Sequence, residues 1–425
     1  MRNFSTVTGG YLLCLIPLAL LTGSFLPDLF ISIISIIFVL NSLINKEWFY
    51  YRNKFFVIFI IFCFYLIIRS LLTPHLMTSL ESSLFYFRFG LFSLGVWYLI
   101  NHDKELINKF YYFLLLTFCL ALIEGYYQAI SYEFYKNDTN FIGIHCTEVR
   151  LCLTFNDKLF LGGYLSRLLP LLFAFMLYRN TSSKGPIFLA AFILIAVDVL
   201  VYVSGERTAL GLTFISTLLI ILLISRYKYI RILTLIFSII IIVLITLFSE
   251  TVKERNIDHT YEQVFNNNND DDIRSEIIFS KQHDPIYFTA FKMFLDNPFF
   301  GKGPKLFRVY CTDKEFSKDG TGCTTHPHNT YLQLLSETGI IGLGFILIFA
   351  FYILLQLLNH LYQILFRKKV LLSDYQICIL ICFTLTLFPF LPTLNLFSGW
   401  ISVVYFLPVG FYLHSIYKEN NDSNY

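Results

Sequence analysis

The chain has little charge. Only 14% of its 425 residues are Asp, Glu, Lys or Arg, whereas soluble domains carry about 25%. Hydrophobic residues make up 56% and aromatic residues 18% of the sequence. This composition excludes an ordinary soluble protein. The net charge of +3, without any basic run, gives no indication of binding to nucleic acid.

Long apolar runs take the place of the missing charge. They approach or exceed the ~18 residues that cross a bilayer as a helix. We therefore predict an all-α, polytopic membrane protein with about twelve transmembrane helices. The first run lacks a small-residue cleavage site, so we interpret it as a retained helix rather than a signal peptide. The twelve runs cover residues 10–26, 28–45, 54–73, 84–101, 108–130, 159–178, 186–203, 208–225, 229–248, 339–362, 373–393 and 397–416.

Several patterns typical of other protein classes are missing. The sequence has no internal repeat of the transporter kind, no Gly-rich phosphate loop and no metal-ligand spacing. The Asp270–Asp272 triplet adjoins an Asn tract, which favours a solvated loop tip over a metal site. We therefore predict neither a metal nor a cofactor.

The distribution of Lys and Arg predicts the orientation in the membrane. Basic residues fill the loops on one side, while the short loops on the other side, near Ser24 and Asn395, have none. The positive-inside rule then places both termini in the cytoplasm. Two long loops, 131–158 and 249–330, are predicted to lie outside. We treat 1–425 as one membrane domain whose larger outer part, 249–338, holds short helices.

Four of the nine cysteines lie in these outer loops as close pairs. Neither pair has the CxxC spacing of many metal sites, so disulfides are favoured in an oxidising compartment. Local pairing is the favoured one of three connectivities. It would join Cys146 to Cys152 and Cys311 to Cys323.

A histidine motif ends the second outer loop. His328-Asn329 is followed by nine residues and then by Gly339-x-x-Gly342, where an apolar run begins. A histidine just before a helix suits proton abstraction near pH 7. The alternative is a surface histidine fixed by its neighbour Pro327, and His326 is a weaker candidate for the base.

Local spacing predicts short helices around this motif. Thr330 and Gln333 have capping-box spacing, so a helix is expected to begin at Thr330 and to break at Gly339. Residues 285–295 have the spacing of a helix on the membrane surface, which Asn297-Pro298 would end.

Cationic residues near this loop are candidates for binding phosphate. Arg207 lies in the turn Ser204–Ala209, where it could bind phosphate or merely snorkel or pair with Glu206. Lys302, Lys305 and Arg308 form a basic cluster that a lipid headgroup explains as well as a substrate does. Arg274 and His283 are weaker candidates.

Two arginines are predicted inside membrane spans. Arg88 and Arg167 would each cost at least ~2.5–3.5 kcal/mol in the middle of a bilayer. They should therefore face a polar cavity or a partner such as Glu124 or Asp198. A structural ion pair and a contact with substrate both stay open.

These motifs resemble the O-antigen ligase and O-antigen polymerase family of bacterial envelope enzymes. The resemblance rests on His328-Asn329-x9-Gly339-x-x-Gly342, the Ser204–Ala209 turn and the segment Asp296–Pro304, and it covers about 160–345. It implies a metal-independent, inverting glycosyltransferase. The implied donor is a glycan on undecaprenyl pyrophosphate at the periplasmic face of the bacterial inner membrane.

The resemblance also implies roles for residues. His328 would activate the acceptor hydroxyl, which belongs to lipid A–core in a ligase and to a second lipid-linked repeat in a polymerase. Arg207 would hold the pyrophosphate, with Arg274 or Arg308 as a second arginine. The remaining candidates for contacts with donor, acceptor or membrane lipid are Lys302, Lys305, Asn329, Arg88 and Arg167.

Two other classes of protein compete with this interpretation. A flippase for the same lipid-linked glycan would explain the charges inside the membrane, Arg88, Glu124, Arg167 and Asp198. A structural envelope protein would explain the helices, but it would leave His328 and Arg207 without a role.

Overall fold

The computed structural model describes residues 4–146, 151–152, 160–179, 184–258, 260–261, 283–317 and 320–422. Within these ranges the chain forms helices and no β-strand beyond one isolated bridge between Thr139 and His145. The predicted all-α fold is confirmed. Nine helical stretches of the described chain are long and apolar enough to cross a membrane, and three shorter apolar helices accompany them.

Each of the twelve predicted runs corresponds to a helix. They are α1 (Phe4–Leu21), α2 (Phe25–Ile44), α3 (Lys54–Leu71), α5 (Phe87–His102), α6 (Leu106–Tyr135), α7 (Leu161–Tyr178), α8 (Lys184–Val203), α9 (Arg207–Leu223), α10 (Lys228–Phe248), α15 (Thr330–Tyr362), α16 (Asp374–Thr386) and α17 (Gly399–Asp422).

Short helices connect these spans. They are η1 (Trp48–Arg52), α4 (Leu76–Ser83), α11 (Glu250–Lys253), η2 (Glu254–Asp258), α13 (Asp284–Asp296), α14 (Phe307–Tyr310) and η3 (Gln363–Arg367). Helix α13 matches the predicted 285–295 helix and ends where Asn297-Pro298 was expected to end it. Its side chains Phe288, Phe291 and Leu295 are exposed, as a helix on a membrane surface requires.

One predicted span is shorter than expected. The run 373–393 is helical only to Thr386, because Pro389 and Pro392 lack the amide hydrogen that a helix needs. Residues 387–398 instead form a non-helical connection between α16 and α17. This connection contacts the candidate site described below.

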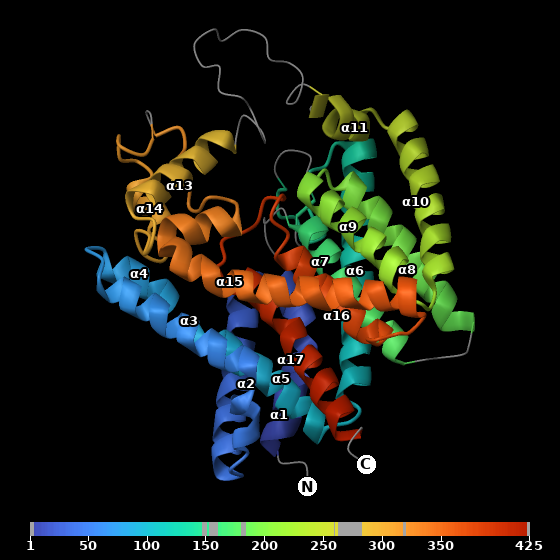
Figure 1. Ribbon diagram of the computed structural model, residues 1–425. Coiled ribbons are helices and arrows are strands. Elements are labelled where there is room, and N and C mark those ends of the chain that lie inside the picture. The colour runs from blue at the N-terminus through green and yellow to red at the C-terminus, as the bar shows by residue number, and fades with distance from the viewer. Residues whose placement is uncertain are drawn as a thin grey trace.

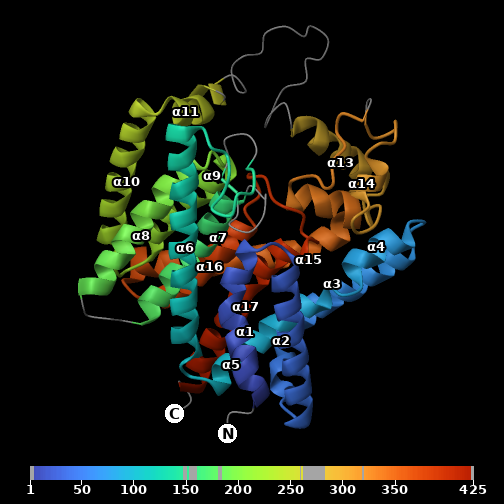
Figure 2. The same ribbon diagram turned by 180° about the vertical axis from the view of Figure 1, so that it is seen from behind.

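The helices form two packed groups, joined by α6 and by the contact of α16 with α17. Helices α1, α2, α5 and α17 pack together, as do α7, α8, α9, α10 and α16, while α6 contacts α1, α7 and α8. Helix α15 crosses the front of the bundle at a steep angle to α6 and α10 (Figure 1). Seen from behind, α6 stands beside α1 along the height of the bundle (Figure 2).

The two ends of the chain lie on one side of the bundle, and α11, α13 and α14 lie towards the other (Figures 1 and 2). This arrangement is what an even number of crossings produces. It puts the second long loop on the side opposite the termini.

The charges inside the bundle pair with one another, but not as predicted. Arg231 of α10 makes a bidentate pair with Asp198 of α8, with N–O distances of 2.7 and 2.9 Å. Arg88 pairs with Asp28 at 2.5 Å. The expectation that Glu124 or Asp198 would accompany Arg88 or Arg167 is therefore wrong, since Asp198 pairs with Arg231, a residue outside the predicted set.

The two remaining charges satisfy backbone groups. Glu124 accepts hydrogen bonds from the Gln128 side chain and from the Phe141 amide, at 2.7 and 2.9 Å. Arg167 donates to the Gly163 carbonyl at 3.1 Å. These charges therefore have structural partners, which weakens the reason for reading the chain as a flippase.

Candidate active site

Helix α15 begins at Thr330 and is broken at Gly339, as predicted. Gly339 has φ +65° and ψ −171°, which interrupts the helical hydrogen bonds. A Cβ at this position would lie 2.3 Å from the Phe299 carbonyl carbon. Only glycine allows both this backbone conformation and this close approach.

The segment Pro298–Gly303 fills the break in α15. The amides of Lys302 and Gly303 donate to the carbonyls of Ser336 and Glu337, at 2.9 and 2.7 Å, and the amide of Ile340 donates to the Pro298 carbonyl at 2.9 Å. Backbone groups freed by the break thus find partners. Two motifs that the sequence placed about forty residues apart form one structural unit.

Helix α3 also holds this unit in place. Arg69 donates to the carbonyls of Phe300 and Gly301, at 2.9 and 2.7 Å, and the Tyr65 hydroxyl donates to the Thr338 carbonyl. Arg69 is not among the residues predicted for the site from the sequence. Its one signal was a lone arginine at the end of an apolar run.

The 387–398 connection holds the other end of the motif. The Thr393 amide donates to the His328 carbonyl at 2.8 Å, and the hydroxyls of Thr330 and Thr393 are 2.9 Å apart. Gln333 donates to Asn395 at 2.7 Å and accepts from the Leu396 amide at 3.0 Å. The first two turns of α15 are therefore fixed at both ends.

Asn329 caps α15. Its side-chain oxygen accepts from the amides of Tyr331 and Leu332, and its side-chain nitrogen donates to the Pro389 carbonyl at 2.9 Å. The predicted capping box between Thr330 and Gln333 is wrong, because Gln333 turns towards the 387–398 connection. Both polar atoms of Asn329 are engaged, so its contribution is to position His328 beside it.

Three histidines gather in front of this helix. The ring of His328 lies 4.1 Å from that of His326 and 5.8 Å from that of His283, measured between ring centroids. His328 has φ +54°, a left-handed conformation that histidine tolerates better than most residues. His283 precedes His328 by forty-five positions and was only a weak candidate from the sequence. Its proximity to His328 is therefore a finding of the structure.

Burial keeps these histidines neutral. It lowers the pKa of His328, and the neighbouring His283 acts in the same direction. Burial also lowers the pKa of His326 to about 3, assisted by His328 and Arg308. A neutral, half-buried imidazole at pH 7 can accept a proton from a hydroxyl group.

The basic cluster separates into paired and unpaired cations. Lys302 pairs with Asp296, and the Lys305 ammonium pairs with Glu81 at 2.6 Å. Within the described part of the chain, Arg308 makes no hydrogen bond or ion pair, although it is close enough to lower the pKa of His326. Arg308 is thus the member of the cluster best placed to meet an anion beside the histidines.

Arg207 is the first residue of α9 and is exposed. The preceding residue, Glu206, accepts hydrogen bonds from the amides of Gly162 and Gly163 at 2.7 and 2.9 Å. A carboxylate there complements the N-terminus of α7. The turn therefore joins the start of α9 to the start of α7, the helix that carries Arg167.

The remaining candidates have different outcomes. Arg274 and Asp270–Asp272 lie outside the described residues.

Disulfides join Cys146 to Cys152 and Cys311 to Cys323. Cys311 belongs to a small core with Ile286, Met293 and Phe307 that connects α13 to α14. No cluster of His, Cys, Asp or Glu in the described ranges could hold a metal ion.

Fold and site together describe a polytopic membrane protein with a histidine motif and cations on one side of its bundle. Residues 189–348 match the family model described as O-antigen ligase, a range that contains Arg207, the Pro298–Gly303 segment and His328. No curated protein matches the chain. Over this range, which is less than half of the chain, the protein is similar to the O-antigen ligase family. The family implies a glycosyltransferase-like enzyme of the bacterial membrane that acts on lipid-linked glycans.

Proposed function

We propose that this protein transfers a glycan from undecaprenyl pyrophosphate to a hydroxyl of lipid A–core or a similar acceptor, at the periplasmic face of the inner membrane. The observation that carries the proposal is the environment of His328. Its neutral imidazole stands before a capped, fixed helix, beside an arginine without a partner in the described chain, and inside the family-matched range.

The reaction has two requirements that these residues meet. The acceptor hydroxyl attacks the anomeric carbon of the donor sugar, and His328 takes its proton. The bond from that carbon to the pyrophosphate oxygen breaks, so negative charge builds on the leaving group. Arg308 and Arg207 stabilise this charge. A single displacement inverts the anomeric carbon.

Ligase and polymerase differ only in the acceptor. A second lipid-linked repeat would replace lipid A–core in a polymerase, and the same base and arginines would serve both reactions. We favour the ligase because the matching family model is described as O-antigen ligase. The polymerase is the second candidate.

The test is a glycan profile from cells lacking this protein, complemented with the native chain or with His328→Ala. For a ligase, we expect His328→Ala to leave long glycan on the polyprenyl lipid and lipid A–core bare. Lipid A–core that carries a single glycan repeat unit would identify a polymerase. Donor trapped on the cytoplasmic side would identify a flippase, and a normal profile with His328→Ala would exclude this histidine as the base.

A further inference from the structure

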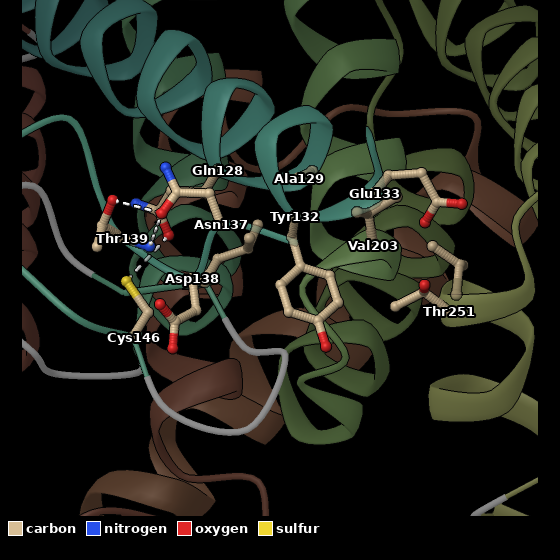
Figure 3. Close-up of a pocket in the computed structure, with 12 residues that line it drawn as sticks. Gln128, Ala129, Tyr132, Glu133, Asn137, Asp138, Thr139, Cys146, Val203 and Thr251 are labelled. Carbon is tan, nitrogen blue, oxygen red and sulfur yellow. Dashed lines mark hydrogen bonds between the residues drawn. The ribbon is translucent and has the colours of Figure 1, made fainter. Parts of the chain in front are cut away.

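A cavity lined by both polar and apolar side chains lies away from the histidine motif. Its lining residues come mainly from the C-terminal end of α6, from the loop that follows and from Thr251 and Val252 of α11 (Figure 3). Helix α11 lies apart from α13 (Figure 1). Helix α6 has 30 residues and is roughly 45 Å long, whereas the bilayer core is about 30 Å thick. The helix is thus longer than one crossing needs, and the predicted span 108–130 leaves its last turns outside the hydrocarbon region.

The wall of the cavity is rigid. Glu124 and Gln128 are buried in α6 and bind the following loop, since Glu124 accepts from the Phe141 amide and Gln128 from the Cys152 amide, both at 2.9 Å. The disulfide between Cys146 and Cys152 closes the same loop. A cavity fixed in this way loses little entropy when a ligand binds.

Several polar atoms in the cavity have no partner among the described residues. They are the Tyr132 hydroxyl, the Asn137 side-chain nitrogen and the second carboxylate oxygen of Asp138, whose first oxygen pairs with His145 at 3.0 Å. The ring of Tyr132 stands between Asp138 on one side and Glu133 and Thr251 on the other (Figure 3).

The charge of the cavity selects against phosphate. Glu133 and Asp138 line it, and no Lys or Arg is among its described lining residues, although the Lys136 ammonium lies 5.5 Å from the centre of the Tyr132 ring. Two carboxylates against one ammonium repel an anion. A tyrosine with hydroxyl, amide and carboxylate groups around it suits a ligand rich in hydroxyl groups.

We propose that this cavity is a saccharide-binding site that holds a neutral or amino sugar of the glycan chain. The proposal rests on the proposed function, because it assigns the two chemically different parts of one substrate to two places. The pyrophosphate would bind the cations near His328, and a sugar further along the chain would bind the acidic cavity. Recognition of the glycan would then be separate from the reacting bond.

The experiment measures binding without turnover. Purified full-length His328→Ala protein in lipid nanodiscs is titrated with oligosaccharide released by mild acid from the host cell's own surface glycolipid. We expect Tyr132→Phe and Asp138→Asn, each added to this background, to weaken binding about 3- to 10-fold, which one or two lost hydrogen bonds produce. Tyr135→Phe is the matched control, because Tyr135 is exposed on the same helix end and does not line the cavity.

Two results would overturn the proposal. One is the absence of binding to the His328→Ala protein, and the other is an equal affinity for the Tyr132→Phe, Asp138→Asn and Tyr135→Phe proteins. The proposed function is tested separately by the glycan profile in cells. A normal profile with His328→Ala, together with weakened binding in Tyr132→Phe, would refute the catalytic role and leave the saccharide site standing.

Discussion

In the basic cluster beside the histidines, the ion-pair partner of each cation matters more for phosphate binding than its charge alone. Lys302 and Lys305 each carry an ion pair with a carboxylate, and Arg308 carries none within the described chain. A cation that already has a carboxylate partner offers less to an incoming pyrophosphate. Lysine also lacks the bidentate geometry that arginine presents to phosphate.

We therefore predict different effects for two matched substitutions. Arg308→Gln should lower the rate of glycan transfer about 10²–10³-fold, the cost of removing one group that stabilises charge in the transition state. Lys305→Gln removes the same charge a few residues away and should change the rate less than 10-fold, by the same reasoning. Transfer to a defined acceptor by the purified proteins measures both. Equal losses would mean that the cluster acts through its summed charge.

The histidines predict the dependence of activity on pH. Because the pKa of His328 is lowered from 6.5, the base stays neutral at pH 6.5 and becomes protonated only at lower pH. We expect the acid limb of kcat/KM to lie below pH 6.5. A limb above pH 6.5 would contradict a base in this environment.

His283 allows that environment to be altered. His283→Asn removes the neighbouring ring that helps to lower the pKa of His328, so the acid limb should move upwards, towards pH 6.5. The comparison of pH profiles for native and His283→Asn proteins measures the shift. A loss of activity with an unmoved limb would show that His283 only supports the structure of the loop.

At the scale of secondary structure, the break in α15 decides where the motif lies. A helix continuing through Gly339 would leave no backbone groups for Pro298–Gly303, and Arg308, which follows this segment, would lose its support. The break is thus a means of joining the second outer loop to a membrane helix. The hydrogen bonds that Pro298–Gly303 supplies offset the free-energy cost of the strained backbone at Gly339.

Two glycines of α15 test this description. In Gly339→Ala, the new Cβ would clash with Phe299 in a left-handed conformation, so we expect destabilisation of at least about 1–3 kcal/mol and loss of transfer. In Gly344→Ala nothing lies within 4 Å of the new Cβ, and alanine should stabilise the helix by roughly 0.5–1 kcal/mol. Thermal unfolding and transfer assays on both proteins measure the contrast. A native-like Gly339→Ala protein would refute the role of the break.

Each of the twelve predicted apolar runs coincides with a helix of the described chain, since hydropathy is a property of each segment by itself. Nine helical stretches of the described chain are long and apolar enough to cross a membrane. The partners of polar side chains were harder to predict because they come from distant segments. Gln333 contacts Asn395 instead of completing a capping box, and Asp198 pairs with Arg231, because tertiary contacts outweigh local spacing. The 387–398 connection offered only two prolines and an apolar composition, which carry no sign of its contacts with His328.

At the scale of the whole molecule, the accessibility of the cysteines to reagents can measure the orientation of the chain in the membrane. The four outer-loop cysteines are paired, and the five free ones belong to helices. In spheroplasts, we expect a membrane-impermeant maleimide to label Cys311 and Cys323 only after treatment with an impermeant reductant. The assay uses a variant whose five helical cysteines are replaced by alanine or serine. Labelling that requires permeabilised membranes would place these loops in the cytoplasm.

The contacts of residues 387–396 with the histidine motif also concern protein synthesis. His328 is made well before this segment, yet its carbonyl, its capping Asn329 and the following turn bind to residues that leave the ribosome near the end of translation. A nascent or truncated chain ending before residue 387 holds every cationic candidate but no fixed histidine. Under the proposed function, we therefore expect transfer activity only after the last helices have been inserted, and we expect a chain truncated before residue 387 to be inactive.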